Sequence, residues 1–221
     1  MNVRKYKLIL ASISLNRLEL LKQVRINPYK VLPVAINETP RKQEQPDLLA
    51  LRLGTEKAAK AKALLEEHES DDVFVLAADT VVSLGRRIIP KPKSREEACD
   101  ILNFLSGRKH TVSTGVCLIS PSGQNRKRLV VTKVFFKRLS FSEIQSYVNS
   151  SEWNEKPGGY AIQGFAGCFV RKLLGSYSNV VGLPLYETVL LLSGEGFPVF
   201  SDLEVLSNGR IKKKNTSMSR M

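Results

Sequence analysis

The sequence predicts an α/β fold, because segments typical of buried strands alternate with segments typical of helices along the 221-residue chain. Residues 72–83 give the clearest strand: eight of the twelve are apolar and four of those are valine, which is typical of a central buried strand. Residues 48–68, rich in Ala, Leu, Lys and Glu, give the clearest helix. A chain of this length has room for one large domain or for two lobes that share a cleft.

A serine-rich turn joins the first predicted strand, residues 8–11, to the first helix. The free N–H groups at the start of a helix favour an anion, and an arginine there can bind phosphate through two hydrogen bonds. The turn therefore predicts phosphate binding by Ser12, Ser14 and Arg17. The alternative is that Ser14 only caps the helix.

The middle of the chain supplies a carboxylate and a cation on irregular segments. Residues 31–34 predict a second strand, and a polar loop that contains Glu38 follows it. Residues 85–87 predict a hairpin-like turn after the central strand. Lys91 then lies between two prolines, so its ammonium group is held on a stiff, extended segment at low entropic cost.

The second half of the chain continues the alternation of strands and helices. Ser94 and Ser140 each precede a glutamate by three residues, which is the spacing of a capping box at the start of a helix. Gly107 is expected to end the first of these helices. Further strands and a last helix are predicted at residues 111–119, 129–137 and 186–192.

Asp79 interrupts the central strand and is followed by the hydroxyl of Thr80. A charge inside such a strand costs several kcal/mol unless it meets a cation, a metal ion or a cavity. One interpretation is a structural aspartate that caps a neighbouring turn. Because the rest of the chain supplies cations and a second carboxylate, Asp79 is instead our candidate catalytic residue.

A glycine-rich stretch at residues 155–164 is the second informative segment. Its three glycines would let the backbone approach a ligand closely. Lys156 offers a cation, and the amide of Gln163 can both donate and accept hydrogen bonds at the edge of a base. The alternative is an ordinary glycine-rich loop.

The net charge of +13 indicates an anionic partner. Five of these charges lie in the tail over residues 208–221, which contains no acidic residue. Such a tail is usually a solvated end with weak, nonspecific affinity for nucleic acid, so we expect no specific nucleic-acid partner. No segment approaches the length of a membrane span, and we expect no membrane partner.

Cysteine and histidine usage narrows the possible metal sites. The three cysteines have no C-x-x-C spacing and the chain contains only two histidines, which argues against a disulfide framework and a zinc site. A reducing cytoplasm fits this composition best. Any metal should be a hard ion held by oxygen atoms, such as Mg²⁺ or Mn²⁺.

Nine short motifs occur in one order between residues 7 and 192. They are Leu10-Ala11-Ser12 with Arg17 and Leu20-Leu21, Asn37-Glu38, Glu56-Lys57-Ala58, Ala78-Asp79-Thr80-Val81-Val82, Lys91-Pro92, Leu105-Ser106-Gly107 with His110, Thr114-Gly115, Tyr160-Ala161-Ile162-Gln163-Gly164 and Val181-Gly182-Leu183-Pro184-Leu185. Together they resemble the Maf family of nucleoside triphosphate pyrophosphatases.

The resemblance implies a two-lobed α/β fold around a curved mixed sheet, with a nucleotide in the cleft between the lobes. It implies hydrolysis of the α–β phosphoanhydride bond, with a divalent metal, to a nucleoside monophosphate and pyrophosphate. It also implies a homodimer. We expect a single domain of this type over residues 1–205 and a basic, flexible tail over residues 206–221.

The resemblance also assigns chemical roles to five residues. Asp79 corresponds to the proton acceptor proposed for the family, and Glu38 to a carboxylate near the metal. Arg17, Lys57 and Lys91 correspond to cations around the triphosphate. Our hypothesis is that Asp79 and Glu38 hold Mg²⁺ and that Asp79 helps to deprotonate the attacking water.

Three residues are expected to decide the base. The Asp-Thr pair and the Ile-Gln-Gly motif resemble the branch that acts on dTTP and UTP, so Thr80 and Gln163 are specificity candidates. The branch that acts on 7-methyl-GTP usually has Gln in place of Thr80. Where the family turn reads S-x-S-P-R-R, this chain has Leu15 and Asn16 for the proline and the first arginine. That arginine is linked to substrate choice, so Asn16 is a third specificity position.

Other functions remain open to the sequence alone. A nucleotide sensor, or a nucleic-acid-binding regulator linked to cell division, could use the same cleft or the basic surface without catalysis. A pyrophosphatase that clears damaged purine nucleotides, or one that clears modified pyrimidine nucleotides, would share the same chemistry.

Overall fold

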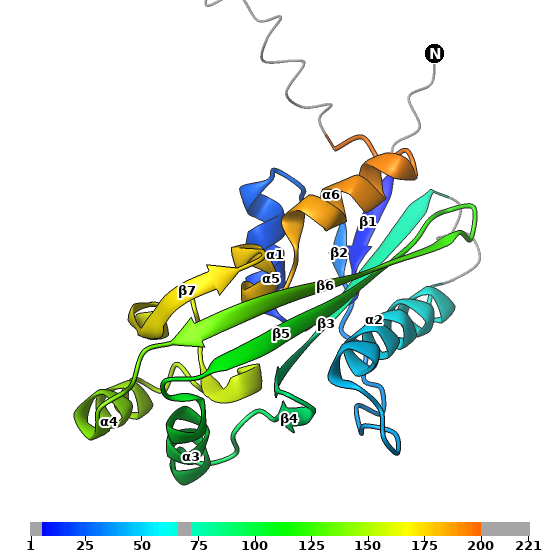
Figure 1. Ribbon diagram of the computed structural model, residues 1–221. Coiled ribbons are helices and arrows are strands. Elements are labelled where there is room, and N and C mark those ends of the chain that lie inside the picture. Colours follow the sequence, from blue (N-terminus) through cyan, green and yellow to red (C-terminus); the bar gives the residue numbers. More distant parts are fainter. Residues whose placement is uncertain (1–5, 66–71, 200–221) are drawn as a thin grey trace, which may run out of the picture.

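A seven-stranded mixed sheet runs through the computed structural model, which describes residues 6–65 and 72–199 (Figure 1). The strands lie in the order β2-β1-β3-β5-β6-β7, and β4 pairs with β3 outside this path. β1 runs parallel to β2 and β3, and the other pairs are antiparallel. The strands are β1 (Lys7–Leu10), β2 (Lys30–Val31), β3 (Val73–Leu84), β4 (Arg87–Ile89), β5 (Lys109–Ile119), β6 (Asn125–Phe136) and β7 (Val170–Leu174).

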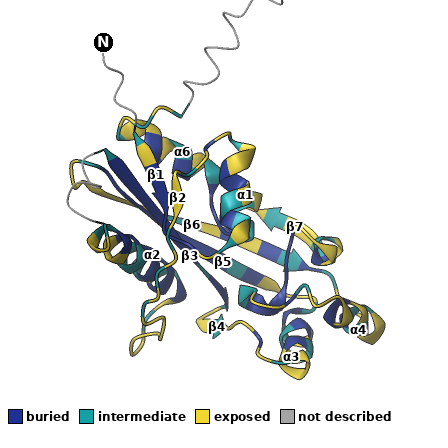
Figure 2. Ribbon diagram, turned by 180° about the vertical axis from the view of Figure 1, so that it is seen from behind, coloured by how far each residue is buried: buried dark blue, intermediate teal, exposed yellow. Residues whose placement is uncertain are grey.

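Helices cover both faces of the sheet. Since successive side chains of a strand point to opposite faces, Val75 of β3 packs with the α2 residues Ala58 and Ala61. Its neighbour Leu76 packs in a separate cluster with side chains of α1 and α6. Figure 2 shows the resulting buried layer along the central strands. The helices are α1 (Leu15–Gln23), α2 (Pro46–Ala63), α3 (Arg95–Leu105), α4 (Phe141–Ser150), α5 (Tyr177–Val181) and α6 (Leu185–Gly194).

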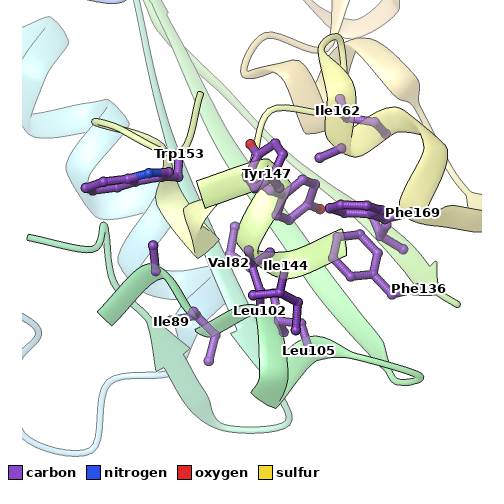
Figure 3. Close-up of a cluster of buried hydrophobic side chains, with 14 of the residues drawn as sticks. Val82, Ile89, Leu102, Leu105, Phe136, Ile144, Tyr147, Trp153, Ile162 and Phe169 are labelled. Carbon is purple, nitrogen blue, oxygen red and sulfur yellow. The ribbon is translucent and has the colours of Figure 1, made fainter. Parts of the chain in front are cut away.

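The long strands β3, β5 and β6 carry a second core at their other end. There Val82 and Phe136 pack with Leu102 of α3 and with Ile144 and Tyr147 of α4 (Figure 3). The two cores are built on the same strands but use different helices. This arrangement confirms the predicted two-lobed α/β fold with a mixed sheet.

An interruption in strand pairing opens the sheet between the two lobes. β1 pairs with β3 only as far as Leu76, and β4 pairs with β3 only from Val82 onwards. Among the described strands, none pairs with residues 77–81 on this edge of β3. The interruption therefore leaves Asp79 and Thr80 on a free strand edge.

Several element boundaries differ from the sequence prediction. β2 covers only Lys30–Val31. Beyond it the Leu32 N–H still donates to the Leu10 carbonyl at 2.9 Å, and Leu32 and Val34 pack against the core. β6 begins at Asn125 and not at residue 129. Its first four residues are exposed and polar, so they carry no apolar signal, but they pair with the buried end of β5. β7 and α5 had not been predicted.

The capping predictions are confirmed to different degrees. At Ser140 both hydrogen bonds of the capping box with Glu143 are present. At Ser94 the hydroxyl accepts from the Glu97 N–H, but the Glu97 carboxylate accepts from the N–H of Lys93.

The basic tail over residues 206–221 lies outside the described residues. Within the described part, no helix is both long enough and apolar enough to cross a membrane.

Candidate functional site

A cavity of about 520 Å³ lies along the free edge of β3. Its walls come from both lobes: the start of α1, the loop before α2, β3 and β5, the glycine-rich loop and the end of α5. Of the predicted site residues, the following line it: Ser14, Asn16, Arg17, Glu38, Lys57, Asp79, Thr80, Lys91 and Gln163. The structure thus brings predicted site residues from six separate segments together in one cavity.

Asp79 and Thr80 project from opposite faces of β3, since they are consecutive in a strand. Asp79 is on the face covered by α2, where it forms an ion pair with Lys57. Thr80 is on the other face, where its hydroxyl accepts from Arg17. Because the strand edge is free here, one cavity reaches both side chains.

Lys57 links the two candidate metal ligands. Its ammonium group forms an ion pair with Asp79 and lies 2.6 Å from Oε1 of Glu38. The side chains of Lys57 and Asp79 are each only 12% exposed, whereas that of Glu38 is 52% exposed. Burial alone would raise the pKa of Glu38, but the hydrogen bond from Lys57 and nearby positive charges hold that pKa below its ordinary value. Glu38 is therefore ionised at neutral pH.

A close contact between two glycines brings α2 down to the sheet beside Asp79. A Cβ atom at Gly54 of α2 would lie 2.4 Å from the carbonyl oxygen of Gly115 in β5. A Cβ atom at Gly115 would lie 2.3 Å from the carbonyl oxygen of Ala50. Gly115 is also the register partner of Asp79. Any side chain at either glycine would push α2 away and with it Lys57, which lies one turn beyond Gly54.

Arg17 is buried against the other face of β3, beside Thr80, and is held by three hydrogen bonds. Its Nε donates to the Gly182 carbonyl at 2.8 Å, its Nη1 to the Ser12 hydroxyl at 3.0 Å and its Nη2 to the Thr80 hydroxyl at 3.3 Å. Burial lowers the pKa of Arg17, against the opposing effect of Asp79 and Glu38. A guanidinium group stays charged even so. With five N–H donors, Arg17 retains two for a ligand in the cavity.

Ser12 does not lie where a substrate-binding residue was predicted. Its hydroxyl accepts from Arg17 and from the backbone N–H of Ser14, and it is not among the residues that line the cavity. The bond to Ser14 also occupies one of the backbone donors that we expected to face a phosphate. Ser12 therefore orients Arg17 from beneath. The Ser14 side chain forms no cap hydrogen bond with α1, although Ser14 occupies the N-cap position.

Thr80 belongs to a buried polar network that ties β3 to α5. Its hydroxyl lies 2.9 Å from that of Thr114, and Thr114 donates to the Asn179 carbonyl at 3.3 Å. The Asn179 amide in turn donates to Thr132 at 2.9 Å. Gly182, at the end of α5, adopts a φ of +132° that favours glycine, and its Cα faces Arg17 and Thr80.

The second lobe supplies a more exposed wall. Lys91 lies 3.4 Å from the carboxylate of Glu155, and their side chains are 47% and 87% exposed. Lys156 and Gln163 also line the cavity, and Gln163 is exposed. Beneath them the Tyr160 hydroxyl lies 2.7 Å from Nε2 of His110, which is buried.

The glycines of residues 155–164 do not serve the purpose we predicted. A Cβ atom at Gly158 would meet the Val82 side chain at 2.8 Å, and one at Gly159 would meet Ile101 at 3.3 Å. Both residues have positive φ values. They let the loop pack against β3 and α3, so the protein interior, and not a ligand, requires them.

Sequence reasoning missed the supporting residues of the site. Thr114 and Gly182 occur in the quoted motifs, but only the fold shows that they hold Thr80 and Arg17. Tyr160 lines the cavity without having been assigned a role, whereas Lys156 was noted as a cation. A signal existed for Gly182, because glycine is the residue that adopts a positive φ at little cost.

Glu38 and Asp79 suit a hard divalent cation. Within residues 6–65 and 72–199, no cluster of three or more His, Cys, Asp or Glu side chains is placed to bind a metal ion. Two carboxylates that converge on one ammonium group nevertheless fit Mg²⁺, which proteins commonly hold by one or two carboxylates together with substrate phosphates and water. The Lys57 ammonium shows that both carboxylates can share one cation.

Comparison with known proteins gives a consistent result. The family model described as "Maf-like protein" matches residues 7–195. The dTTP/UTP pyrophosphatase of Mesorhizobium japonicum is 58% identical over 194 residues, which are 87% of this chain and 93% of that protein. The dTTP/UTP pyrophosphatase of Agrobacterium fabrum is 54% identical over 198 residues, 89% of this chain and 96% of that protein.

Solved structures are less similar. A HAM1 protein from Coxiella burnetii matches with a TM-score of 0.41 and 12% identity, over 61% of this chain and 75% of that one. This similarity is too low to support an argument about function.

Proposed function

Because the chain belongs to the Maf family, as its nine motifs predicted, we propose that it is a nucleoside triphosphate pyrophosphatase that acts on dTTP and UTP. It hydrolyses the α–β phosphoanhydride bond and releases a nucleoside monophosphate and pyrophosphate. The observation that carries this proposal is the Lys57 ammonium between two carboxylates, in a cavity that also contains Arg17 and Lys91. These are the charges that hydrolysis of a triphosphate requires.

The residues divide the chemistry between them. Asp79 accepts a proton from the attacking water, and Glu38 and Asp79 together would hold Mg²⁺ or Mn²⁺. When bound, the metal would supply positive charge to the phosphates and favour deprotonation of the attacking water. Lys57 and Arg17 bind phosphate oxygens from one wall of the cavity, and Lys91 binds them from the other. Ser14, at the start of α1, adds a donor.

Base choice is assigned to the same cavity, away from the carboxylates. Gln163 offers an amide that can pair with the edge of a pyrimidine, and Thr80 is held in one orientation by Arg17 and Thr114. Asn16, which stands at the first arginine of the family motif S-x-S-P-R-R, also lines the cavity. The names of the relatives as dTTP/UTP pyrophosphatases support the pyrimidine assignment despite this difference. Modified pyrimidine nucleotides would fit the same groups.

The remaining assignments rest on composition and resemblance. Cys99, Cys117 and Cys168 form no disulfide, which supports a reducing compartment, and we place the enzyme in the cytoplasm. We also propose that the protein forms a homodimer, which sedimentation analysis would test. We also propose that residues 1–205 suffice for activity and that the tail over residues 206–221 is dispensable, which a truncated chain would test.

The decisive experiment measures pyrophosphate release from a panel of nucleoside triphosphates with Mg²⁺ or Mn²⁺, beside an Asp79→Asn variant. Release from dTTP and UTP that disappears in the variant supports the proposal. Release from purine triphosphates alone would overturn the base assignment but keep the chemistry. Binding of nucleotide without any release would favour the sensor function instead.

A further inference from the structure

Glu38 lies in a long loop, and something must fix its position. Residues 32–45, between β2 and α2, form no helix or strand. Fixing the backbone of each loop residue costs conformational entropy. An unpaired loop of this length would therefore leave the Glu38 carboxylate free to move away from Lys57 and Asp79.

Apolar side chains anchor only the first part of this loop. Leu32 and Val34 pack against the core cluster between α2 and β3, and Ile36 packs against a neighbouring cluster that includes Leu53. Beyond Ile36 the loop residues up to residue 43 are exposed. The anchor therefore ends two residues before Glu38.

On the C-terminal side of Glu38, a nearly buried ion pair anchors the loop. Nε of Arg52 on α2 lies 2.7 Å from Oε1 of Glu44, and its Nη2 lies 2.8 Å from Oε2. The same Nη2 donates to the carbonyl of Thr39 at 3.1 Å. The side chains of Arg52 and Glu44 are only 14% and 10% exposed. Such a two-pronged, shielded pair is stronger and more directional than an ordinary surface ion pair.

Further contacts from α2 support this arrangement. Lys60 donates to the carbonyl of Ala35 at 2.5 Å, on the side before Glu38. Within α2, Glu56 accepts from Arg52 at 3.1 Å and helps to orient it. Arg52, Glu56 and Lys60 are spaced by four residues, so they lie on one face of α2. Lys57 directly follows Glu56, and the helix that presents Lys57 therefore also fixes the loop that presents Glu38.

We propose that Arg52 and Glu44 form a clamp that positions Glu38 for the divalent metal of the metal–nucleotide complex. The inference rests on the proposed function, since it names further positioning residues for that reaction. Neither residue lines the cavity, so the clamp acts through Glu38 and not by contact with substrate. Residues that hydrogen-bond to metal ligands without touching the metal act in a comparable way, and their removal typically lowers metal affinity by about 10–100-fold.

The charge state of the clamp suits this role. The hydrogen bonds from Arg52 lower the pKa of Glu44 to about 2, against a smaller opposing effect of burial. The pair therefore stays ionised across the whole neutral and mildly acidic range. A change in pH within that range would not release the loop.

The first test compares Arg52→Gln with wild type by Mn²⁺ affinity. The concentration of free Mn²⁺ is measured by electron paramagnetic resonance in the presence of α,β-imido-dUTP, which has no cleavable α–β oxygen bridge. We expect the apparent dissociation constant for Mn²⁺ to rise about tenfold. The affinity for the nucleotide without metal should stay the same, because Arg17, Lys57 and Lys91 are unchanged. An unaltered Mn²⁺ affinity would overturn the inference.

A double-mutant cycle separates positioning from loss of structure. In a Glu38→Gln background, the Arg52→Gln substitution should have no further effect on Mn²⁺ affinity, because the clamp acts only through Glu38. A merely structural role would add the same loss in both backgrounds. The exchanged pair Arg52→Glu with Glu44→Arg should recover part of the affinity.

Arg41→Gln is the matched control. Arg41 lies in the loop that contains Glu38 and carries the same charge as Arg52. Its side chain, however, is 69% exposed and pairs with Glu56 at 3.2 Å. Its removal leaves the contacts of Arg52 with Glu44 and Thr39 in place. We expect Mn²⁺ affinity within about twofold of wild type, as for a surface ion pair. A loss as large as that of Arg52→Gln would contradict the clamp.

The outcomes distinguish this inference from the proposed function. If Mn²⁺ binds, the clamp variants weaken it and yet no triphosphate is hydrolysed, the proposed function fails and the clamp stands. If wild type releases pyrophosphate but Arg52→Gln keeps full Mn²⁺ affinity, the function stands and the clamp fails. If wild type binds no Mn²⁺ with the nucleotide, the clamp fails whether or not pyrophosphate is released.

Discussion

The two walls of the cavity are built in different ways. On the wall that carries Asp79, Lys57 and Arg17, the charged side chains are mostly buried and each already has a partner in the protein. On the facing wall, Lys91 and Gln163 are on exposed segments, and the contact of Lys91 with Glu155 is 3.4 Å long. Buried, partnered charges are held in one geometry, whereas exposed side chains adapt. We therefore expect the reacting groups on the first wall and, on the second, Gln163 as the adaptable contact to the base.

The largest expected effect comes from the buried wall. Asp79→Asn should lower pyrophosphate release by about 10³-fold, because the amide neither accepts a proton nor binds a metal well. Nucleotide binding without metal should persist. Glu155→Gln, on the facing wall, is the control, and its turnover should stay within about twofold of wild type. Equal losses in both variants would break the contrast between the walls.

The exposed wall nevertheless lies over the buried side chain of His110, which can titrate. Burial lowers the pKa of His110 from 6.5 to about 4. The unfolded chain takes up a proton below pH 6.5, but the folded protein resists until about pH 4, so stability falls as pH is lowered through this window. Between pH 6.5 and 4 the loss should reach about 3 kcal/mol.

Urea unfolding at several pH values in this window measures that loss. His110→Gln keeps a side chain that can bond to the Tyr160 hydroxyl but does not titrate, so its unfolding free energy should fall less steeply with decreasing pH. If the variant and wild type have the same slope, His110 is not the group responsible.

The buried wall should also be sensitive to a single methyl group. Gly115→Ala places a Cβ atom against the backbone of Ala50 and should destabilise the protein by about 2 kcal/mol, through displacement of α2. The control is Gly194→Ala near the end of α6, where no atom lies within 4 Å of the added Cβ. Urea midpoints compare the two. A tolerated Gly115→Ala with full activity would show that Lys57 does not depend on this contact.

The smallest effect should be one of selectivity. Gln163→Ala should reduce kcat/KM for UTP by about tenfold, as expected for the loss of a hydrogen bond to a base. Activity on the other triphosphates of the panel should change less. A uniform loss for every base would place Gln163 with the phosphate-binding residues and would contradict the division of labour between the walls.

Much of the site was predictable because its signals are local. Asp79 stands out because a carboxylate inside an apolar strand has few explanations, and Lys91 because two prolines stiffen its segment. The capping box at Ser140 is a pattern of neighbouring residues, and the structure contains both of its hydrogen bonds. The contact of Ser12 with Arg17 was missed for the opposite reason. The role of Ser12 depends on where the Arg17 side chain turns, which no neighbour in the sequence decides.

The sequence by itself determined most of the strands and helices, the acid in the central strand and the family to which the chain belongs. These follow from short-range periodicity and from motifs whose residues are adjacent. Only the tertiary structure decided that β1 ends where β3 still continues, which opens the edge at Asp79. It also decided that Gly54 and Gly115 touch and that Arg52 reaches Glu44. The glycine contact joins segments far apart in the chain, and the Arg52–Glu44 pair joins a helix to an irregular loop whose path the rest of the fold sets, so no local pattern records either contact.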